Sequence, residues 1–600
     1  MKKYNYLLLL SAVTATAAFT SCDEDKLEIP QKGVTPMEEF YLTDEDAESA
    51  LVTVYADTYD NLAFMGDVTG WNYSPYLALT TFLGDDIFLA GSGTGDCGPE
   101  REYHDFRYNT SNNVVLGGYT GFYRSIHKCN LLLNHFEEVA NPTQTMKRCI
   151  AEARVMRAWD HLMLGIYWGR PPIVTTVLTK EDAPANSGSQ EEVMQWVVDE
   201  INAALPDLDE RQSPDDFGGA VKITKGFANA VKGKALLWKK DYAGAKAALQ
   251  EVIKSGKYAL VPSEDMQKIG HSNGKGSSEI VFEFNVQPSS NVNISGSNRQ
   301  IGNFPYTFNW RYEFFNGTPT DGRLLKDGWG WVNPSKAFCE ALIANDGMDS
   351  YRRKAWIISY EELLYNLQWP GDKVENGGLE MKIDGKDTTY TLIPGKTDAK
   401  VNDPGRGLGK EYYGNCGYFC WKTVMHEPND NAAQNWCGTW NKNFTIMRYA
   451  EVLLMYAEAC AQLGETSGEG LKVLNDIQYR AGSAHVSAAL SLEEVQNEKW
   501  FEMFQDGCRG VDLIRWGKTE TLKTQDHEVW NLVDESSKSK KDKDGNWVVI
   551  IPHKWSVVKD AQSDIFKNAG AGFKPGKSEL LPFPETVINL NSNLEQNPGW

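Results

Sequence analysis

The chain has 600 residues, of which 41% are hydrophobic and 12% are aromatic, with 19 Trp and 26 Tyr. This length exceeds what one ordinary hydrophobic core supports, and this composition excludes a disordered chain. The formal net charge of -21 argues against nucleic acid as a partner, because the phosphate backbone repels an acidic surface.

The first 21 residues have the pattern of a secretory signal peptide. Lys2 and Lys3 provide a basic start, an apolar run begins at Leu7, and small residues follow. Beyond this segment the sequence has no apolar run long enough to cross a bilayer. We therefore expect residues 1–21 to be a signal peptide that is removed during export.

The signal peptide runs into Phe19-Thr20-Ser21-Cys22, which resembles a bacterial lipobox. In a lipobox the cysteine becomes the lipidated first residue of the mature protein. The acidic residues 23–25 resemble the surface-export signal of Bacteroidetes lipoproteins. We expect Cys22 to carry a lipid anchor and residues 22–42 to form a tether, since two or three acyl chains hold a protein stably at a membrane. The alternative is a signal peptide followed by an unmodified cysteine.

Amphipathic helical patterns dominate residues 43–286. Residues 149–159 repeat apolar side chains at spacings of three and four, and the pair Pro171-Pro172 is expected to end that helix. This region is predicted to be an N-terminal helical region.

Two helix pairs have the size and the alanine content of tetratricopeptide-like units. In the first pair, Thr224 is expected to cap a helix over residues 225–240, and a second helix follows over residues 243–255. The second pair covers residues 445–463 and 468–480. Stacked pairs of this kind share a core and expose a concave face that suits a partner protein.

Residues 287–442 differ from the helical regions on either side. They are rich in Gly, Asn, Trp and Tyr, and strand-like runs occur at residues 279–284 and 390–393. Long irregular stretches inside a compact protein are usually functional. We predict a mainly α fold, in which a tetratricopeptide-like helical-repeat scaffold carries a large loop-rich insertion with short strands. A C-terminal helical region over residues 443–600 completes it, with an exposed loop at residues 536–545.

Nine of the ten cysteines follow Cys22. Cys416, Cys420 and Cys437 lie close together, and the sequence leaves open whether two of them form a disulfide. Only His426 lies near them, so we expect no metal site and no cofactor. Five other cysteines lie in expected helices, where a small buried side chain is the usual role: Cys129, Cys149, Cys339, Cys460 and Cys508.

A series of short motifs in one order resembles the SusD/RagB family of nutrient-binding outer-membrane lipoproteins of Bacteroidetes. The departures are small: Arg170 stands where a second Gly is usual, and Trp600 where Tyr is common. The motifs are Leu27-Glu28-Ile29-Pro30, Glu152-Ala153-Arg154, Tyr167-Trp168-Gly169-Arg170-Pro171-Pro172, Thr224-Lys225-Gly226, Asp241-Tyr242-Ala243, Met447-Arg448-Tyr449-Ala450-Glu451, Arg480-Ala481-Gly482, Asp506-Gly507-Cys508-Arg509-Gly510, Leu581-Pro582-Phe583-Pro584 and Gln596-Asn597-Pro598-Gly599-Trp600.

The resemblance implies a four-unit tetratricopeptide-like scaffold, with the ligand site in the variable residues 287–442. It also implies a surface protein that lies as a lid over a SusC-like TonB-dependent outer-membrane barrel. The helical scaffold then faces the barrel, and an oligosaccharide or polysaccharide is trapped between the two proteins.

Aromatic residues in loop-like context are the candidates for a glycan platform. Flat rings bind the apolar C–H faces of sugars, while Asn, Asp and Arg side chains bind adjacent hydroxyls. Of the pair Trp329 and Trp331, at least one is expected in the core, and Trp329 is kept as a ligand candidate. The other candidates are Trp71, Tyr73, Trp310, Tyr312, Phe314, Trp436 and Trp440.

The segment Gly84-Asp85-Asp86 and the glycine-rich residues 91–96 predict a loop at the rim of the site. The glycines lack the Lys-Ser/Thr of a phosphate-binding loop, and calcium needs more clustered oxygen ligands. Asp85, Asp86 and Arg101 are therefore predicted to contact the ligand directly.

Charged residues inside the family-like helices are expected to form ion pairs that brace the scaffold, with no catalytic or transport role. These residues are Arg154, Arg157, Arg448, Glu451, Arg509, Asp512 and Arg515.

Two other classes of function compete with a glycan binder. A surface glycosidase needs two carboxylates on opposite sides of the scissile bond, but helical repeats and the lack of a catalytic signature argue against an enzyme. A protein-interaction scaffold explains the helices but leaves the aromatic insertion without a role. A binder of peptides or other nutrients in the same lid position stays open.

Overall fold

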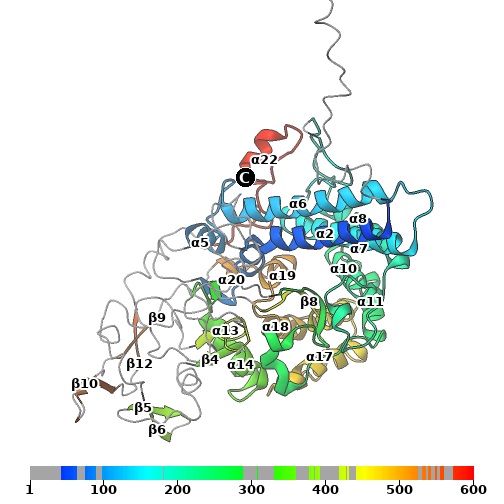
Figure 1. Cartoon of the computed structure of the whole chain (residues 1–600). Helices are drawn as coiled ribbons and strands as arrows, with labels where there is room; N and C mark the ends of the chain where they lie inside the picture. The colour runs from blue at the N-terminus through cyan, green and yellow to red at the C-terminus, as the bar shows by residue number, and fades with distance from the viewer. Residues whose placement is uncertain are drawn as a thin grey trace, which may run out of the picture.

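The computed structural model shows a protein built largely from helices (Figure 1). The residues that it describes are 42–63, 74–89, 97–179, 181–287, 307–308, 330–359, 378–383, 386–391, 418–427, 429–430, 441–523, 530–534, 538–541, 543, 547–550, 555–559 and 572–600. Among the helices in these ranges, none has the length and apolar character needed to cross a membrane.

The N-terminal half of the scaffold contains four long helices: α2 (Asp44–Ala63), α6 (Asn113–Phe136), α7 (Gln144–Trp168) and α8 (Gln190–Ala204). Thr143 and Ser189 cap α7 and α8 by accepting hydrogen bonds from the backbone N–H groups of Met146 and Glu192. Gly169, with a φ of 72°, ends α7, so the helix stops before the proline pair that was expected to end it.

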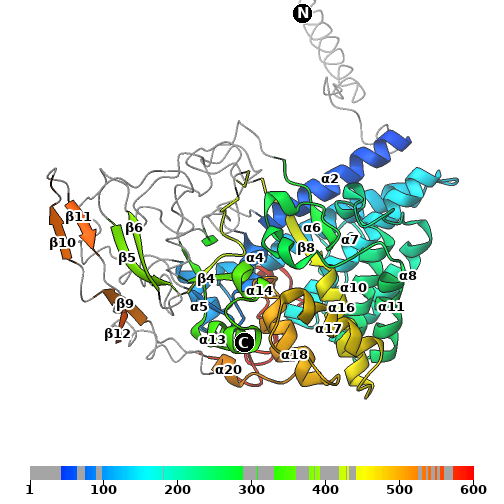
Figure 2. The same ribbon diagram turned by 90° about the horizontal axis from the view of Figure 1, so that it is seen from below.

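The second half of the scaffold contains α10 (Lys225–Trp238), α11 (Tyr242–Lys254), α16 (Tyr449–Gln462), α17 (Glu469–Ala481), α18 (Leu492–Glu502) and α19 (Arg509–Arg515). The scaffold helices pack in the order α2, α6, α7, α8, α10, α11, α16 and α17, each against the next. Figures 1 and 2 show this continuous stack of helices. The predicted helical-repeat scaffold is therefore confirmed.

Thr224 is the N-cap residue of α10, as predicted, but its hydroxyl makes no capping hydrogen bond and instead shares one of 3.2 Å with the Tyr258 hydroxyl. One detail of the second predicted pair is wrong. The helix predicted to start at residue 445 starts at Tyr449, since residues 444–448 form a strand that pairs with residues 280–284.

Six two-stranded antiparallel sheets lie in the described part of the chain. The pairs are β1 (Ile87–Leu89) with β3 (Val332–Pro334), β2 (Ile280–Phe284) with β8 (Phe444–Arg448), β4 (Ile357–Ser359) with β7 (Tyr418–Cys420), β5 (Gly378–Ile383) with β6 (Lys386–Thr391), β9 (Trp530–Asp534) with β12 (Trp555–Lys559), and β10 (Lys538–Lys541) with β11 (Trp547–Ile550). The expected loop at residues 536–545 thus contains a strand, β10.

Short helices complete the described chain. They are α4 (Pro75–Thr81), α5 (Gly98–His104), α9 (Phe217–Ala220), α13 (Lys336–Asp346), α14 (Tyr351–Trp356), α20 (Glu520–Lys523) and α22 (Glu585–Leu590), with the 3-10 helices η3 (Leu205–Asp207), η4 (Ser263–Lys268) and η5 (Ser272–Gly274).

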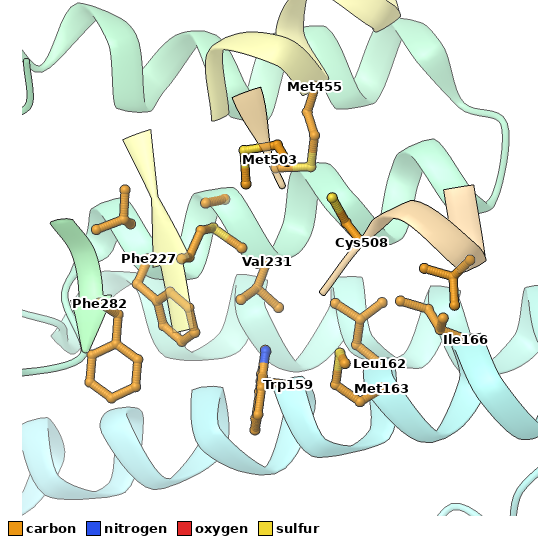
Figure 3. Packing of buried hydrophobic residues seen from close by; sticks show 14 of the residues in the cluster. Trp159, Leu162, Met163, Ile166, Phe227, Val231, Phe282, Met455, Met503 and Cys508 are labelled. Atoms are coloured by element: carbon orange, nitrogen blue, oxygen red, sulfur yellow. The ribbon is translucent and has the colours of Figure 1, made fainter. Parts of the chain in front are cut away.

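One continuous hydrophobic core joins the two halves of the scaffold. Figure 3 shows its centre, where Trp159 and Leu162 of α7 face Val231 of α10, with Met503 and Cys508 close by. All of these side chains are buried. Each large apolar side chain buried in this way stabilises the fold by about 1.5–3 kcal/mol.

Candidate functional site

Most of the predicted ligand residues lie outside the described residues. Asp85, Asp86 and Arg101 are described. The aromatic candidates that fall outside are Trp71, Tyr73, Trp310, Tyr312, Phe314, Trp329, Trp436 and Trp440. The structure nevertheless shows the elements from which these segments leave the scaffold.

The chain that follows Trp71 and Tyr73 is fixed to the scaffold at Ser74. The Ser74 Oγ donates a hydrogen bond of 2.8 Å to the carbonyl of Leu62 at the end of α2. The same Oγ accepts a bond of 3.2 Å from the N–H of Leu77 and so caps α4. This contact holds the start of α4 beside the end of α2.

A second attachment is the short ladder between β1 and β3. Leu89, the last residue of β1, pairs with Val332 of β3, so the described chain just before the glycine-rich residues 91–96 lies beside the described chain that follows Trp329. Trp331 is 2% exposed, and its backbone N–H donates to the carbonyl of Thr307 at 2.9 Å. The expectation that at least one of Trp329 and Trp331 belongs to the core is confirmed by Trp331.

Asp85 is bound to the scaffold by an ion pair. Its carboxylate accepts two hydrogen bonds from Arg509, at 2.6 Å from Nε and 3.1 Å from Nη2. The Arg509 guanidinium also lies over the ring of Trp500, 4.5 Å from its centre. Ser335, the cap of α13, donates its Oγ–H to the carbonyl of Asp85 at 2.7 Å. These contacts join the 84–86 segment to α13 and α19.

Asp86 and Arg101 are buried. Burial, followed by the charge of the neighbouring Asp85, raises the pKa of Asp86 to about 7. No described residue donates a hydrogen bond to the Asp86 Oδ1, which lies where a side chain on Gly84 would have to fit. That Asp85, Asp86 and Arg101 contact the ligand stays a prediction. In the structure, Asp86 and Arg101 are buried and Asp85 forms an ion pair with Arg509.

The two ends of the insertion are joined at its base. The insertion leaves after β2 and returns into β8, and these strands pair with each other. Glu283 of β2 accepts hydrogen bonds from the Asn443 amide at 2.6 Å, the Gly276 N–H at 2.7 Å and the Thr445 hydroxyl at 3.3 Å. Burial raises the pKa of Glu283 to about 7.

Arg448, the last residue of β8, is the centre of a buried ion network. Its guanidinium lies 2.5 Å from Glu279, 3.0 Å from Glu502 and 2.5 Å from Asp506. Lys422, from the far end of the insertion, also binds Asp506 at 2.6 Å. The network therefore ties the return of the insertion to β2 and to the segment after α18.

The predicted structural role of the helix charges is confirmed. Each of them forms ion pairs with neighbouring elements: Arg154 with Glu137, Arg157 with Glu200, Arg448 with Glu279, Glu451 with Lys234, Arg509 with Asp85, Asp512 with Lys499, and Arg515 with Glu458.

Sequence reasoning missed a polar cluster beside this network. His271 hydrogen-bonds Asp430 through Nδ1 at 2.7 Å, and the His426 ring stacks on Trp421 with ring centres 4.0 Å apart. Lys442 donates to the carbonyl of Thr423 at 3.0 Å. These residues come from separate segments of the chain, so no local sequence pattern predicts that they form a cluster. In the residues that the structure describes, no group of His, Cys, Asp and Glu is arranged to hold a metal ion.

The expected burial of the five helical cysteines is confirmed. Cys420 is also a buried free thiol, and its sulfur hydrogen-bonds Thr423 and Gln505. Cys416 and Cys437 lie outside the described residues, so the open question of a disulfide between these two is untouched.

This chain is similar to known proteins both in sequence and in fold. The sequence model of the SusD family matches residues 278–600. A SusD-like protein of Bacteroides ovatus is 21% identical over 628 aligned residues, which cover 98% of this chain and 97% of that protein. The SusD-like protein P2 of Formosa agariphila is 22% identical and covers 86% of this chain and 91% of its own length.

Solved structures with the same fold include a glycan-binding protein and a laminarin-binding protein. Surface glycan-binding protein A from Bacteroides thetaiotaomicron, in complex with laminarihexaose, has a TM-score of 0.65 and 20% identity and covers 93% of this chain and 100% of its own. A laminarin-binding SusD-like protein has a TM-score of 0.64 and 19% identity and covers 93% and 99%. At these identities, the likeness establishes the fold.

Proposed function

The chain belongs to the SusD family, and we propose that it captures an oligosaccharide or polysaccharide at the cell surface and delivers it to a partner SusC-like TonB-dependent transporter. The observation that carries this proposal is the family match over residues 278–600, which spans the predicted ligand region. Two structural relatives, one named as a surface glycan-binding protein and one as laminarin-binding, support a sugar as the class of ligand.

The chemistry of the insertion suits a neutral glycan. Its aromatic candidates offer flat apolar rings, and its Asn and Asp side chains offer hydroxyl-binding groups. The described attachments at Ser74, β1 and β3 hold the bases of these segments in fixed positions. Shallow, hydrated sites leave little surplus free energy, so we expect modest affinity.

We infer that the protein binds glycan without cleaving it. The charged residues of the family-like helices are used in ion pairs between scaffold elements. A lipid anchor on Cys22 and a tether over residues 22–42 would hold this non-enzymatic binder at the outer surface of the outer membrane, above its transporter.

Affinity electrophoresis of residues 23–600 through gels that contain plant, microbial and host polysaccharides tests the proposal. We expect one glycan class to retard the protein, and Trp310→Ala or Trp71→Ala to remove the retardation. Tyr479→Ala is the matched control, because this aromatic ring is 64% exposed on the helical scaffold. Retardation by no glycan, or by a peptide matrix alone, would exclude the glycan ligand.

Surface delivery has its own test. Cys22→Ser should release the protein from the outer membrane, while the wild-type protein on intact cells should be degraded by added protease. Co-purification with a TonB-dependent barrel from detergent-solubilised membranes is expected for the wild-type protein, and its absence would contradict the transporter partnership.

A further inference from the structure

An open groove of about 760 Å³ lies on the helical scaffold. It runs along α2 from residue 48 to residue 60, and the start of α7, residues 221–222 and residues 284–287 complete its walls. Figure 2 shows α2 along the edge of the helical half, beside α7. A volume of this size is typical of sites that bind small organic ligands.

The floor of the groove is aromatic. Tyr55 and Tyr59 lie one helical turn apart on α2, so they present their rings on the same face. Both rings pack against Phe284, with ring centres 6.3 Å and 5.9 Å away. Both tyrosines are only partly buried and line the groove. Neighbouring, partly exposed rings are the kind of surface that apolar sugar faces bind.

The floor is held in place before any ligand arrives. The Tyr55 hydroxyl donates a hydrogen bond of 2.6 Å to Glu152 and accepts one of 2.7 Å from the N–H of Ile223. A ring held both by its contact with Phe284 and by its hydroxyl loses little freedom on binding. Such preorganisation lowers the entropic cost of complex formation.

The charges around the groove largely cancel. Arg148 donates to Glu152 at 2.7 Å and to Glu48 at 2.8 Å. The other charged groups in the lining, Asp60 and Lys222, are of opposite sign. A lining with this balance attracts neither strong anions nor strong cations, and it matches a neutral ligand.

The rim also carries exposed amide side chains. Asn285 and Gln287 follow β2 and line the groove on the side opposite α2. An amide offers a donor and an acceptor, which is what adjacent sugar hydroxyls require. Gln287 is also the first residue of the predicted ligand region, so the groove and that region are adjacent along the chain.

We propose that this groove is a second carbohydrate-binding surface, which holds a segment of a neutral oligosaccharide or polysaccharide against Tyr55 and Tyr59, with the buried Phe284 ring behind them. The inference rests on the proposed function in one respect, that the ligand is a glycan. It adds a separate site on the scaffold, through which one long glycan chain contacts the protein at two places.

Two neighbouring substitutions on α2 test this site. Val52 is 66% exposed and lines the groove, whereas the exposed Thr53 does not. Val52→Arg places a long charged side chain over the groove, and Thr53→Arg adds the same side chain and charge beside it. Arg is a good helix former, so both variants should keep α2 intact. Asn285→Ala provides an independent second variant on the opposite wall.

Calorimetric titration and hydrogen exchange are measured on residues 23–600 with hexasaccharides of neutral glucans, including laminarihexaose, and with the polysaccharide that retards the protein. We expect bound glycan to protect the backbone of residues 48–60 and 284–287. Val52→Arg should remove this protection and weaken binding of the polysaccharide about tenfold, while Thr53→Arg leaves both unchanged. Asn285→Ala should weaken binding in the same direction.

The outcomes separate this site from the proposed function. Glycan binding without protection of α2, and with wild-type affinity in Val52→Arg, would overturn the groove site and leave the proposed function standing. Binding of no glycan by the wild-type protein would overturn both. Protection of the groove by a peptide pool, and by none of the sugars, would assign it to a peptide and overturn the carbohydrate site.

Discussion

Arg448→Met removes the centre of the buried ion network at the base of the insertion. Three carboxylates surround the guanidinium: Glu279 at 2.5 Å, Glu502 at 3.0 Å and Asp506 at 2.5 Å. The side chains of Arg448, Glu279 and Glu502 are each at most 2% exposed. Methionine fills much of the same space but leaves the carboxylates without this cation.

The expected cost follows from that burial. Removing one partner of a buried ion pair costs about 3–5 kcal/mol, because the remaining charge is left buried and uncompensated. Arg154→Met is the control, since Arg154 pairs with Glu137 at a half-exposed site where the side chains are 26% and 37% exposed. A pair of that kind contributes at most about 1 kcal/mol.

The cost should also depend on pH. Burial raises the pKa of Glu502, but Arg480, Arg448 and Arg352 together outweigh it and hold the pKa below its ordinary value. A lowered carboxyl pKa contributes stability that is present above the unfolded pKa of about 4.3 and is lost as the pH falls through the folded value. The cost of Arg448→Met is therefore largest at neutral pH and shrinks below about pH 4.

Urea unfolding followed by tryptophan fluorescence, at pH 7 and at pH 3, measures both effects. We expect Arg448→Met to lower the free energy of unfolding by several-fold more than Arg154→Met at pH 7, and the difference to be smaller at pH 3. Equal costs for the two variants at pH 7, or a cost of Arg448→Met that grows toward pH 3, would refute the assignment of the network as a structural anchor.

Three further predictions follow from the described contacts. Burial raises the pKa of Glu283 to about 7, so the stability tied to its neutral form is present below the unfolded pKa and lost as the pH rises through 7. The free energy of unfolding of Glu283→Gln, relative to that of the wild type, should therefore increase from pH 4 to pH 8. A relative stability that falls with rising pH in urea titrations would contradict this. Asp85→Asn weakens the bidentate pair with Arg509 and should lower stability by about 1–3 kcal/mol, which a thermal-shift series would detect. Five buried thiols should resist a thiol reagent in the native protein and react with it after unfolding without reductant: Cys129, Cys149, Cys420, Cys460 and Cys508. Peptide mass spectrometry maps the reacted residues, and a disulfide at any of the five would contradict the structure.

Helix periodicity and turn chemistry were enough to predict the scaffold. The pair observed at α10 and α11 agrees within two residues with the prediction, because the apolar spacing of a helix and the Asp241 turn are local features. The family motifs then placed these local elements in one known order.

Elements that depend on distant partners were not predictable. Residues 445–448 were predicted to start a helix, yet they belong to β8 because β2, about 160 residues earlier, offers a partner strand. Gly84-Asp85-Asp86 was predicted to be a loop at the rim of the ligand site. In the structure, Arg509, 424 residues away, pairs with Asp85, and Ser335 at the start of α13 donates a hydrogen bond to the same residue. Short apolar or glycine-rich runs carry no local sign of such tertiary contacts.

For the ligand candidates, too, the sequence predicts local features but not how distant segments come together. Loop aromatics are recognisable by composition, but which rings form one platform depends on how several segments come together. The structure shows only the base of the predicted site: the contact of Ser74 with the end of α2, the β1–β3 ladder and the ion pair of Asp85. The groove along α2 had no sequence signature, because α7 and β2 supply its other walls.

The central claim is that this SusD-family protein binds a glycan and leaves it intact. Calorimetric titration of residues 23–600 with the polysaccharide that retards the protein, followed by size analysis of the recovered glycan, tests it most directly. We predict saturable heat of binding and a recovered glycan of unchanged length. No heat with any polysaccharide, or shortened products after incubation, would contradict it.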